Sequence, residues 1–175
     1  MKHFFLFLAL PLLLVSCKKN DPVSALPPET QTGANTFGCL VNGQPWTPQG
    51  NDGTSNYTVS YDTFPNGGIL EIITYKIYGL GPNDFQSLSL WTSQLAGPGT
   101  YFFQDKQRAI ASFNDQKTNC YWRNADSTTT YRRGSLTLTR LDLKAGIVSG
   151  TFAFTLYKPG CDSVRITQGR FDRKL

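Results

Sequence analysis

From Thr36 to the C-terminus, apolar and polar residues alternate with a period of two, and this alternation most constrains the fold. Such alternation is typical of β-strands, and no apolar set recurs at helical spacing over three turns. Turns rich in Gly, Pro, Asn and Asp separate the alternating segments at intervals of about ten residues. The pattern predicts an all-β chain of antiparallel strands, as a β-sandwich or a barrel-like domain. The strands are expected at 69–78, 87–92, 135–141, 147–156 and 164–171.

Two local signals refine this fold. Asn42-Gly43 is a hairpin signal that joins the segment 37–41 to Trp46. Gly150 lies in the middle of the 147–156 strand, where it indicates a bulge or a bend. Residues 36–175 suffice for one hydrophobic core and are too few for two, so a single β domain is expected.

The N-terminus has the composition of a secretion signal. Lys2 precedes the apolar run 4–15, which is too short for the ~20 residues that span a bilayer. The run ends in Leu14-Val15-Ser16-Cys17, which resembles the lipobox of bacterial lipoproteins. The resemblance implies that residues 1–16 are removed and that Cys17 carries the lipid. An ordinary secretory signal with a chance cysteine is the alternative.

Residues 17–35 are expected to form the lipidated cysteine and a flexible tether. Residues 18–35 contain three prolines, few apolar residues and no periodicity. As a flexible coil they would span roughly 25 Å. The β domain would then stand just off the membrane that holds Cys17, in the cell envelope, on the periplasmic face or the outer surface of the outer membrane.

Charge and composition exclude several partners and mechanisms. The formal net charge is +5, and the densest basic sites are Lys18-Lys19 and Arg132-Arg133. The sequence has no cluster of Lys and Arg residues with aromatic residues interleaved among them. This distribution predicts no nucleic-acid binding. The one histidine is His3, inside the expected signal. The mature chain would therefore have no histidine base and no histidine-ligated zinc.

A family resemblance can be stated from three segments of the mature chain. The segment 36–48 (TFGCLVNGQPWTP), the segment 147–154 (IVSGTFAF) and the closing segment 166–172 (ITQGRFD) look like an uncharacterised lipoprotein family of Bacteroidetes, catalogued as a domain of unknown function. The resemblance implies the location and the β fold, and it brings no activity or catalytic residue with it.

Three cysteines remain beside Cys17, and an oxidising compartment allows them one disulfide and one free thiol. Cys39 lies in an apolar strand pattern and is expected to be a buried thiol. Cys120 and Cys161 flank turn-like polar residues, so their pairing is preferred. The other pairings, or no disulfide, stay open. No CxxC spacing supports a metal site.

Two tryptophans are candidate ligand-binding residues. Parity in 87–92 places Trp91 on the face opposite Leu88 and Leu90, and Trp122 lies beside Arg123 near turn residues. Exposed rings of this kind can stack on a sugar. The favoured hypothesis is a non-enzymatic lipoprotein whose β domain binds a glycan, a protein or an envelope component, with no cofactor and no metal. A structural or interaction subunit of an envelope assembly and a histidine-independent hydrolase are the alternatives.

Overall fold

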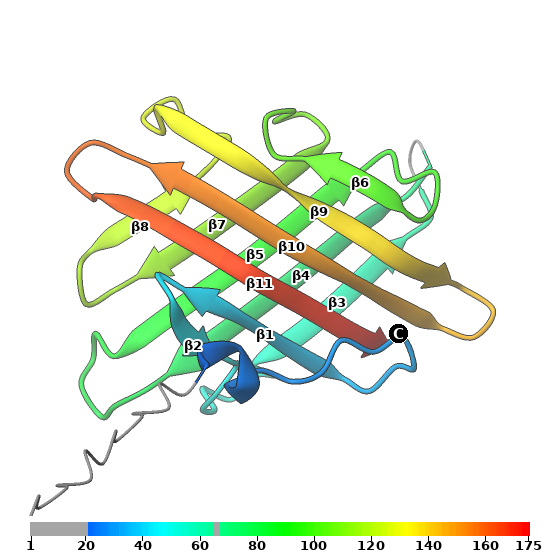
Figure 1. The fold of residues 1–175 in the computed structure, drawn as a ribbon, viewed down its shortest axis with the longest axis horizontal. Coiled ribbons are helices and arrows are strands. Elements are labelled where there is room, and N and C mark those ends of the chain that lie inside the picture. The colour runs from blue at the N-terminus through cyan, green and yellow to red at the C-terminus, as the bar shows by residue number, and fades with distance from the viewer. Residues whose placement is uncertain (1–20, 65–66) are drawn as a thin grey trace, which may run out of the picture.

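The computed structural model describes residues 21–64 and 67–175, which form two antiparallel sheets packed face to face. The six-stranded sheet has the order β2-β1-β11-β10-β9-β6, and the five-stranded sheet has the order β3-β4-β5-β7-β8. The predicted all-β fold is therefore confirmed, as a β-sandwich whose two sets of strands cross at a wide angle (Figure 1). The strands are β1 Thr36–Val41, β2 Gln44–Trp46, β3 Tyr57–Asp62, β4 Ile69–Ile77, β5 Phe85–Ser93, β6 Gly99–Phe102, β7 Ala109–Asp115, β8 Cys120–Arg123, β9 Tyr131–Asp142, β10 Ile147–Tyr157 and β11 Ser163–Lys174.

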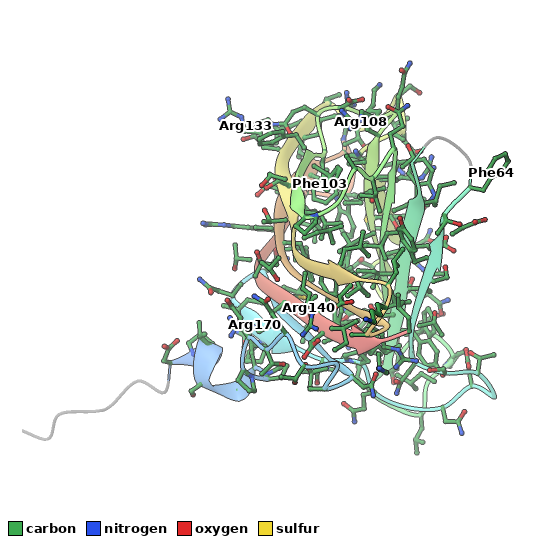
Figure 2. All side chains as sticks on the ribbon, turned by 90° about the vertical axis from the view of Figure 1, so that its right-hand side faces the viewer. Phe64, Phe103, Arg108, Arg133, Arg140 and Arg170 are labelled. Carbon is green, nitrogen blue, oxygen red and sulfur yellow. A yellow bond between two sulfur atoms is a disulfide. The ribbon has the colours of Figure 1, made fainter. Side chains whose placement is uncertain are left out.

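The core lies between the sheets and is built from the inward residues of each alternating strand. In β5, Leu88, Leu90 and Thr92 are buried, whereas the residues between them are partly exposed. Phe103 lies between the layers in the side view, and Phe64, in the loop after β3, points into solvent (Figure 2). Each sheet covers the apolar face of the other sheet. The alternation of apolar and polar residues in the sequence therefore corresponds to an alternation of buried and exposed side chains.

Both local signals have the predicted outcome. Asn42 and Gly43 have φ values of 49° and 82°, and they connect β1 to β2 in a tight hairpin. At Gly150 the register between β9 and β10 shifts, which marks a bulge. A Cβ atom at Gly150 would collide with the Thr137 carbonyl oxygen and the Phe171 ring, so glycine is required there.

The N-terminal segment differs from the prediction. Residues 18–35 are expected as a flexible tether, but residues 26–35 pack against the six-stranded sheet after the 3₁₀ helix η1, Pro22–Ala25. Leu26 is buried, and Thr30, Gly33 and Ala34 donate hydrogen bonds to the Asp172 carboxylate in β11. We call residues 26–35 the N-terminal strap. The prediction fails here because the partners of this polar segment, chiefly the Asp172 carboxylate and also Arg140, Arg170 and Lys174, lie more than 100 positions away in the sequence.

The expected signal peptide, residues 1–16, and the expected lipidation site Cys17 lie outside the described residues. Within residues 21–64 and 67–175, no helix has the length and apolar character needed to cross a membrane.

Candidate functional site

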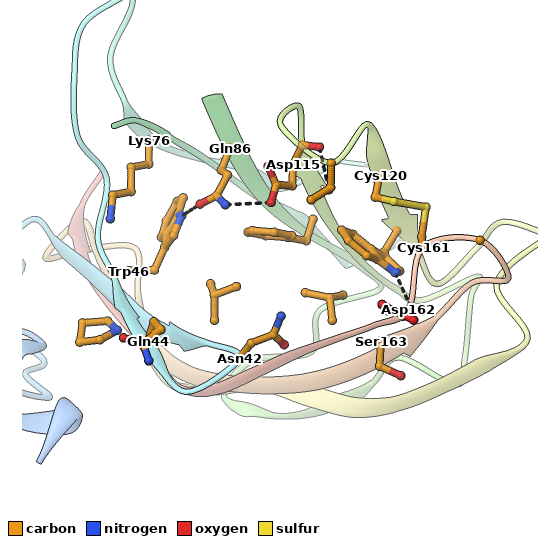
Figure 3. A pocket seen from close by; sticks show the side chains of 17 residues that line it. Asn42, Gln44, Trp46, Lys76, Gln86, Asp115, Cys120, Cys161, Asp162 and Ser163 are labelled. Carbon is orange, nitrogen blue, oxygen red and sulfur yellow. Dashed lines mark hydrogen bonds between the residues drawn. A yellow bond between two sulfur atoms is a disulfide. The ribbon is translucent and has the colours of Figure 1, made fainter. Parts of the chain in front are cut away.

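A cleft of about 540 Å³ opens between the two sheets at one end of the sandwich (Figure 3). One wall comes from β1, β2 and the start of β11, and the other comes from β4, β5, β7 and β8. The β10–β11 turn, residues 158–162, closes one side. The cleft therefore combines segments that are far apart in the sequence, from Val41 to Val164.

Three aromatic side chains form the apolar floor of the cleft: Trp46 from β2, Phe113 from β7 and Trp122 from β8. The rings of Phe113 and Trp122 are tilted against each other, with centroids 6.1 Å apart. The exposed fractions of Trp46 and Trp122 are 2% and 6%, so only a narrow part of each ring reaches the cleft. A bound molecule would meet apolar edges below it and polar groups around it.

Lys76, Gln86 and Asp115 form a polar row across the five-stranded sheet. They pair directly across β4, β5 and β7, and side chains at such positions share one face. Gln86 Oε1 accepts a hydrogen bond from Trp46 Nε1 at 3.0 Å, and Gln86 Nε2 donates to Asp115 Oδ2 at 3.1 Å. These two bonds orient the amide, because a flipped amide would place a donor against the indole N–H and an acceptor against the carboxylate.

The structure joins Cys120 and Cys161, the pair preferred from the sequence, by a disulfide beside the cleft. Cys120 begins β8 of the five-stranded sheet, and Cys161 lies in the β10–β11 turn of the six-stranded sheet. The disulfide thus links the two walls of the cleft. Cys39 is a buried free thiol, and burial raises its pKa well above the usual value while the charge of Lys76 opposes that rise.

The two candidate tryptophans lie on opposite faces of the five-stranded sheet. Trp91 is half-buried on the outer face, opposite Glu71 and Ile110, where parity predicts it. Trp122 was expected to be partly exposed, and this is wrong, because its ring packs on Phe113 and its Nε1 donates to the Asp162 carbonyl oxygen at 3.1 Å. The two rings therefore cannot form one stacking platform.

Sequence reasoning missed Trp46, Gln86, Lys76 and Asp115 as cleft residues. Trp46 and Gln86 are 40 positions apart, and their hydrogen bond depends on how the two sheets face each other. The one usable signal is parity in β4, since Lys76 continues the inward row of Ile72 and Thr74 and so places a charge on an apolar face.

Ionised and metal-ligating groups elsewhere give no competing site. Hydrogen bonds lower the pKa of the Asp52 and Asp142 carboxyl groups, chiefly from Thr54 and Arg140, and neither residue lines the cleft. Across the part of the chain that the structure describes, no three His, Cys, Asp or Glu side chains gather as a metal site would require.

Comparison with known proteins shows that the sequence of this chain matches a family model. The family model described as "Domain of unknown function (DUF6252)" matches residues 66–173, which include β4 to β10 and nearly all of β11. No curated protein and no solved structure matches the chain.

Proposed function

We propose that this chain, which belongs to the DUF6252 family, is a lipid-anchored lipoprotein of the bacterial cell envelope whose β domain binds a glycan in the inter-sheet cleft. Membrane attachment is through Cys17, on the outer membrane, and the domain binds its ligand without catalysis.

The observation that carries the binding function is the composition of the cleft. It combines aromatic and aliphatic side chains with amide, carboxylate, ammonium and hydroxyl groups in about 540 Å³. Saccharides present hydroxyl groups that both donate and accept hydrogen bonds, together with apolar C–H faces. Gln86, Asp115 and Asn42 line the cleft with both kinds of hydrogen-bonding group.

The resemblance to the lipobox supports the anchor, because Leu14-Val15-Ser16-Cys17 follows a basic residue and a short apolar run. A single acyl chain binds a membrane only weakly, whereas two or more acyl chains on one cysteine hold a domain on it stably. A glycan ligand fits this location, since envelope surfaces are rich in polysaccharide.

The absence of histidine after His3 supports a binding role over hydrolysis. Asp, Lys and Tyr can still act as acids or bases, so the proposal needs a direct test of turnover. Saccharides incubated with the purified protein should be recovered at their original length by chromatography. Shortened products would refute the non-catalytic role.

The binding function is tested by calorimetric titration of the full chain, purified in detergent, with a panel of envelope and plant oligosaccharides. Gln86→Ala removes the group that bridges Trp46 and Asp115, so it should weaken binding by about tenfold. Trp91→Ala is the matched control, because Trp91 lies on the outer face of the same sheet. Circular dichroism and melting temperature establish that both variants fold. Failure of the whole panel to bind would refute the function.

An interaction subunit is a second candidate, favoured by the outer face of the five-stranded sheet. There Ile69 and Ile73 flank Glu71 along β4, Trp91 pairs with Glu71 across β5, Ile110 of β7 pairs with Trp91, and Ile73 is 45% exposed. Apolar residues on a flat outer face can bind a protein partner. In that case Trp91→Ala would disrupt an assembly isolated from membranes, and Gln86→Ala would leave it intact.

A further inference from the structure

We propose that the cleft binds an acidic saccharide, with the carboxylate of a uronic acid residue at Lys76 and its ring hydroxyl groups at Asp115. This inference rests on the proposed glycan-binding function and names the class of sugar.

The position of Lys76 carries the first step. Leu70, Ile72 and Thr74 of β4 point into the sandwich and are fully buried, and Lys76 is next in that inward series. Lys76 lines the cleft, and its side chain lies on the same side of the cleft as Trp46 (Figure 3). The opposing effect of its charge on the pKa of the buried Cys39 thiol agrees with this inward orientation.

Lys76 has no counter-ion within the described residues, where the ion pairs involve Arg123, Arg140 and Arg170. Lys76 is half-buried as a residue, and a carboxylate that enters the cleft would give its ammonium group a charge-assisted contact. A neutral sugar offers Lys76 a hydroxyl group only. An amino sugar would add a second cation beside it.

The remaining charges of the cleft set the orientation of the ligand. Asp115 is two strands away from Lys76, a distance of about 10 Å at the usual strand spacing. Asp162 lies at the other end of the cleft, beside Trp122 (Figure 3). Carboxylates accept hydrogen bonds from hydroxyl groups, so the hydroxyl-bearing side of the sugar belongs near Asp115 and its carboxylate near Lys76.

Gln86 lies between these two charges and can contact the ring. Its Oε1 and one Nε2 hydrogen are engaged by Trp46 and Asp115, which leaves one N–H and one oxygen lone pair. A uronic acid carries its carboxylate on one side of the ring and hydroxyl groups on the other. The row Lys76–Gln86–Asp115 therefore offers a cation, an amide and an anion in the order that this sugar requires.

The test compares matched probes on the full chain in detergent. Trimers of galacturonic acid and of glucuronic acid are titrated calorimetrically beside their methyl esters, which have the same rings and linkages without the negative charge. We expect at least one acid trimer to bind about tenfold more tightly than its ester. The difference should shrink with added NaCl, because salt screens the charge contact.

Lys76→Met removes the charge and keeps most of the length of the side chain. It should lower the affinity for the acid trimer to that for the ester, and Lys76→Arg should retain most of the affinity. Trp91→Ala serves as the control outside the cleft, and melting curves exclude unfolding. Equal binding of acid and ester, or unchanged acid binding by Lys76→Met, overturns the inference.

Failure of the inference and failure of the proposed function give different results. If neutral oligosaccharides bind and neither acid trimer binds more tightly than its ester, the acidic class is wrong and glycan binding stands. If no saccharide binds, both are wrong. Preferential binding of an amine-bearing sugar would place the recognition at Asp115 and would also overturn the inference.

Discussion

At the scale of single residues, Asp172 shows how one carboxylate organises a distant segment. It is 1% exposed and accepts hydrogen bonds from Thr30 Oγ1, from Ser149 Oγ and from three backbone N–H groups of the N-terminal strap. Burial opposes its ionisation, but these hydrogen bonds outweigh burial and lower its pKa well below the usual 3.8.

Asp172→Asn should release the strap and lower the free energy of unfolding by about 3 kcal/mol at pH 7. Because the carboxyl stays ionised in the fold while the unfolded chain protonates near pH 3.8, wild-type stability should fall as the pH drops through 4. The variant should show a smaller fall. Urea denaturation at pH 7, 4 and 3 measures both effects.

Asp105→Asn is the control, since its exposed carboxylate accepts a hydrogen bond from Gln107 N in a surface turn. An equal loss of stability in Asp105→Asn and Asp172→Asn would contradict the role given to the buried carboxylate.

Cys39 yields a second prediction at this scale. A full-length Cys17→Ser chain, denatured without reductant, should show one reactive thiol, because Cys120 and Cys161 are joined. The folded protein should show almost none, since burial raises the pKa of Cys39 and shields its sulfur. Alkylation followed by mass spectrometry counts the thiols and locates them. Three modified cysteines would exclude the disulfide.

Residue burial could be predicted from the sequence where it follows local parity. Trp91 illustrates this, because its neighbours Leu90 and Thr92 are buried and its own side chain faces outward. Parity could not place Trp122, whose burial depends on Phe113 and on the Asp162 carbonyl oxygen, 40 positions away. The cleft was missed for the same reason: its residues become neighbours only when two sheets pack.

At the scale of elements, the longer alternating strands could be predicted, whereas the short or mixed ones were missed, and so was β3, although its sequence alternates over six residues. β4, β5, β9, β10 and β11 overlap the expected segments, although β5, β9 and β11 extend beyond them at both ends and β10 extends by one residue. β6 and β8 have four residues each, too few for a period to show. β7 buries three consecutive residues, Ala111 to Phe113, so its pattern lacks simple alternation.

The disulfide between β8 and the β10–β11 turn gives the prediction for this scale. Cys120→Ser/Cys161→Ser should lower the free energy of unfolding by about 4 kcal/mol, because the disulfide closes a loop of 41 positions in the unfolded chain. Ligand binding in the cleft should also weaken, since the β10–β11 turn would no longer be joined covalently to β8. Chemical denaturation and ligand titration measure the two effects. Reductant should destabilise the wild-type protein and leave the double variant unchanged.

At the scale of the whole molecule, the proposed anchor and the N-terminal strap together set where the domain would stand. With residues 26–35 packed on the sheet, at most residues 18–25 separate Cys17 from the domain. A Cys17→Ser chain expressed in a host that processes bacterial lipoproteins should leave the membrane fraction and lose fatty-acid labelling. The wild-type chain should keep both. The anchor would be refuted if the wild-type chain carried no fatty-acid label and both the wild-type and the Cys17→Ser chains stayed in the membrane fraction.

The pairing of β1 with β11 sets the order in which the chain can fold as it is synthesised. β1 lies between β2 and β11, and the strap depends on Asp172 of β11, which is synthesised after the other ten described strands. Contacts so far apart in sequence also make folding slow. The six-stranded sheet therefore stays incomplete until β11 has been synthesised. The chain therefore stays incompletely folded during its synthesis and while this sheet slowly forms. A step that needs an unfolded chain, such as passage through an export channel, can take place in that period.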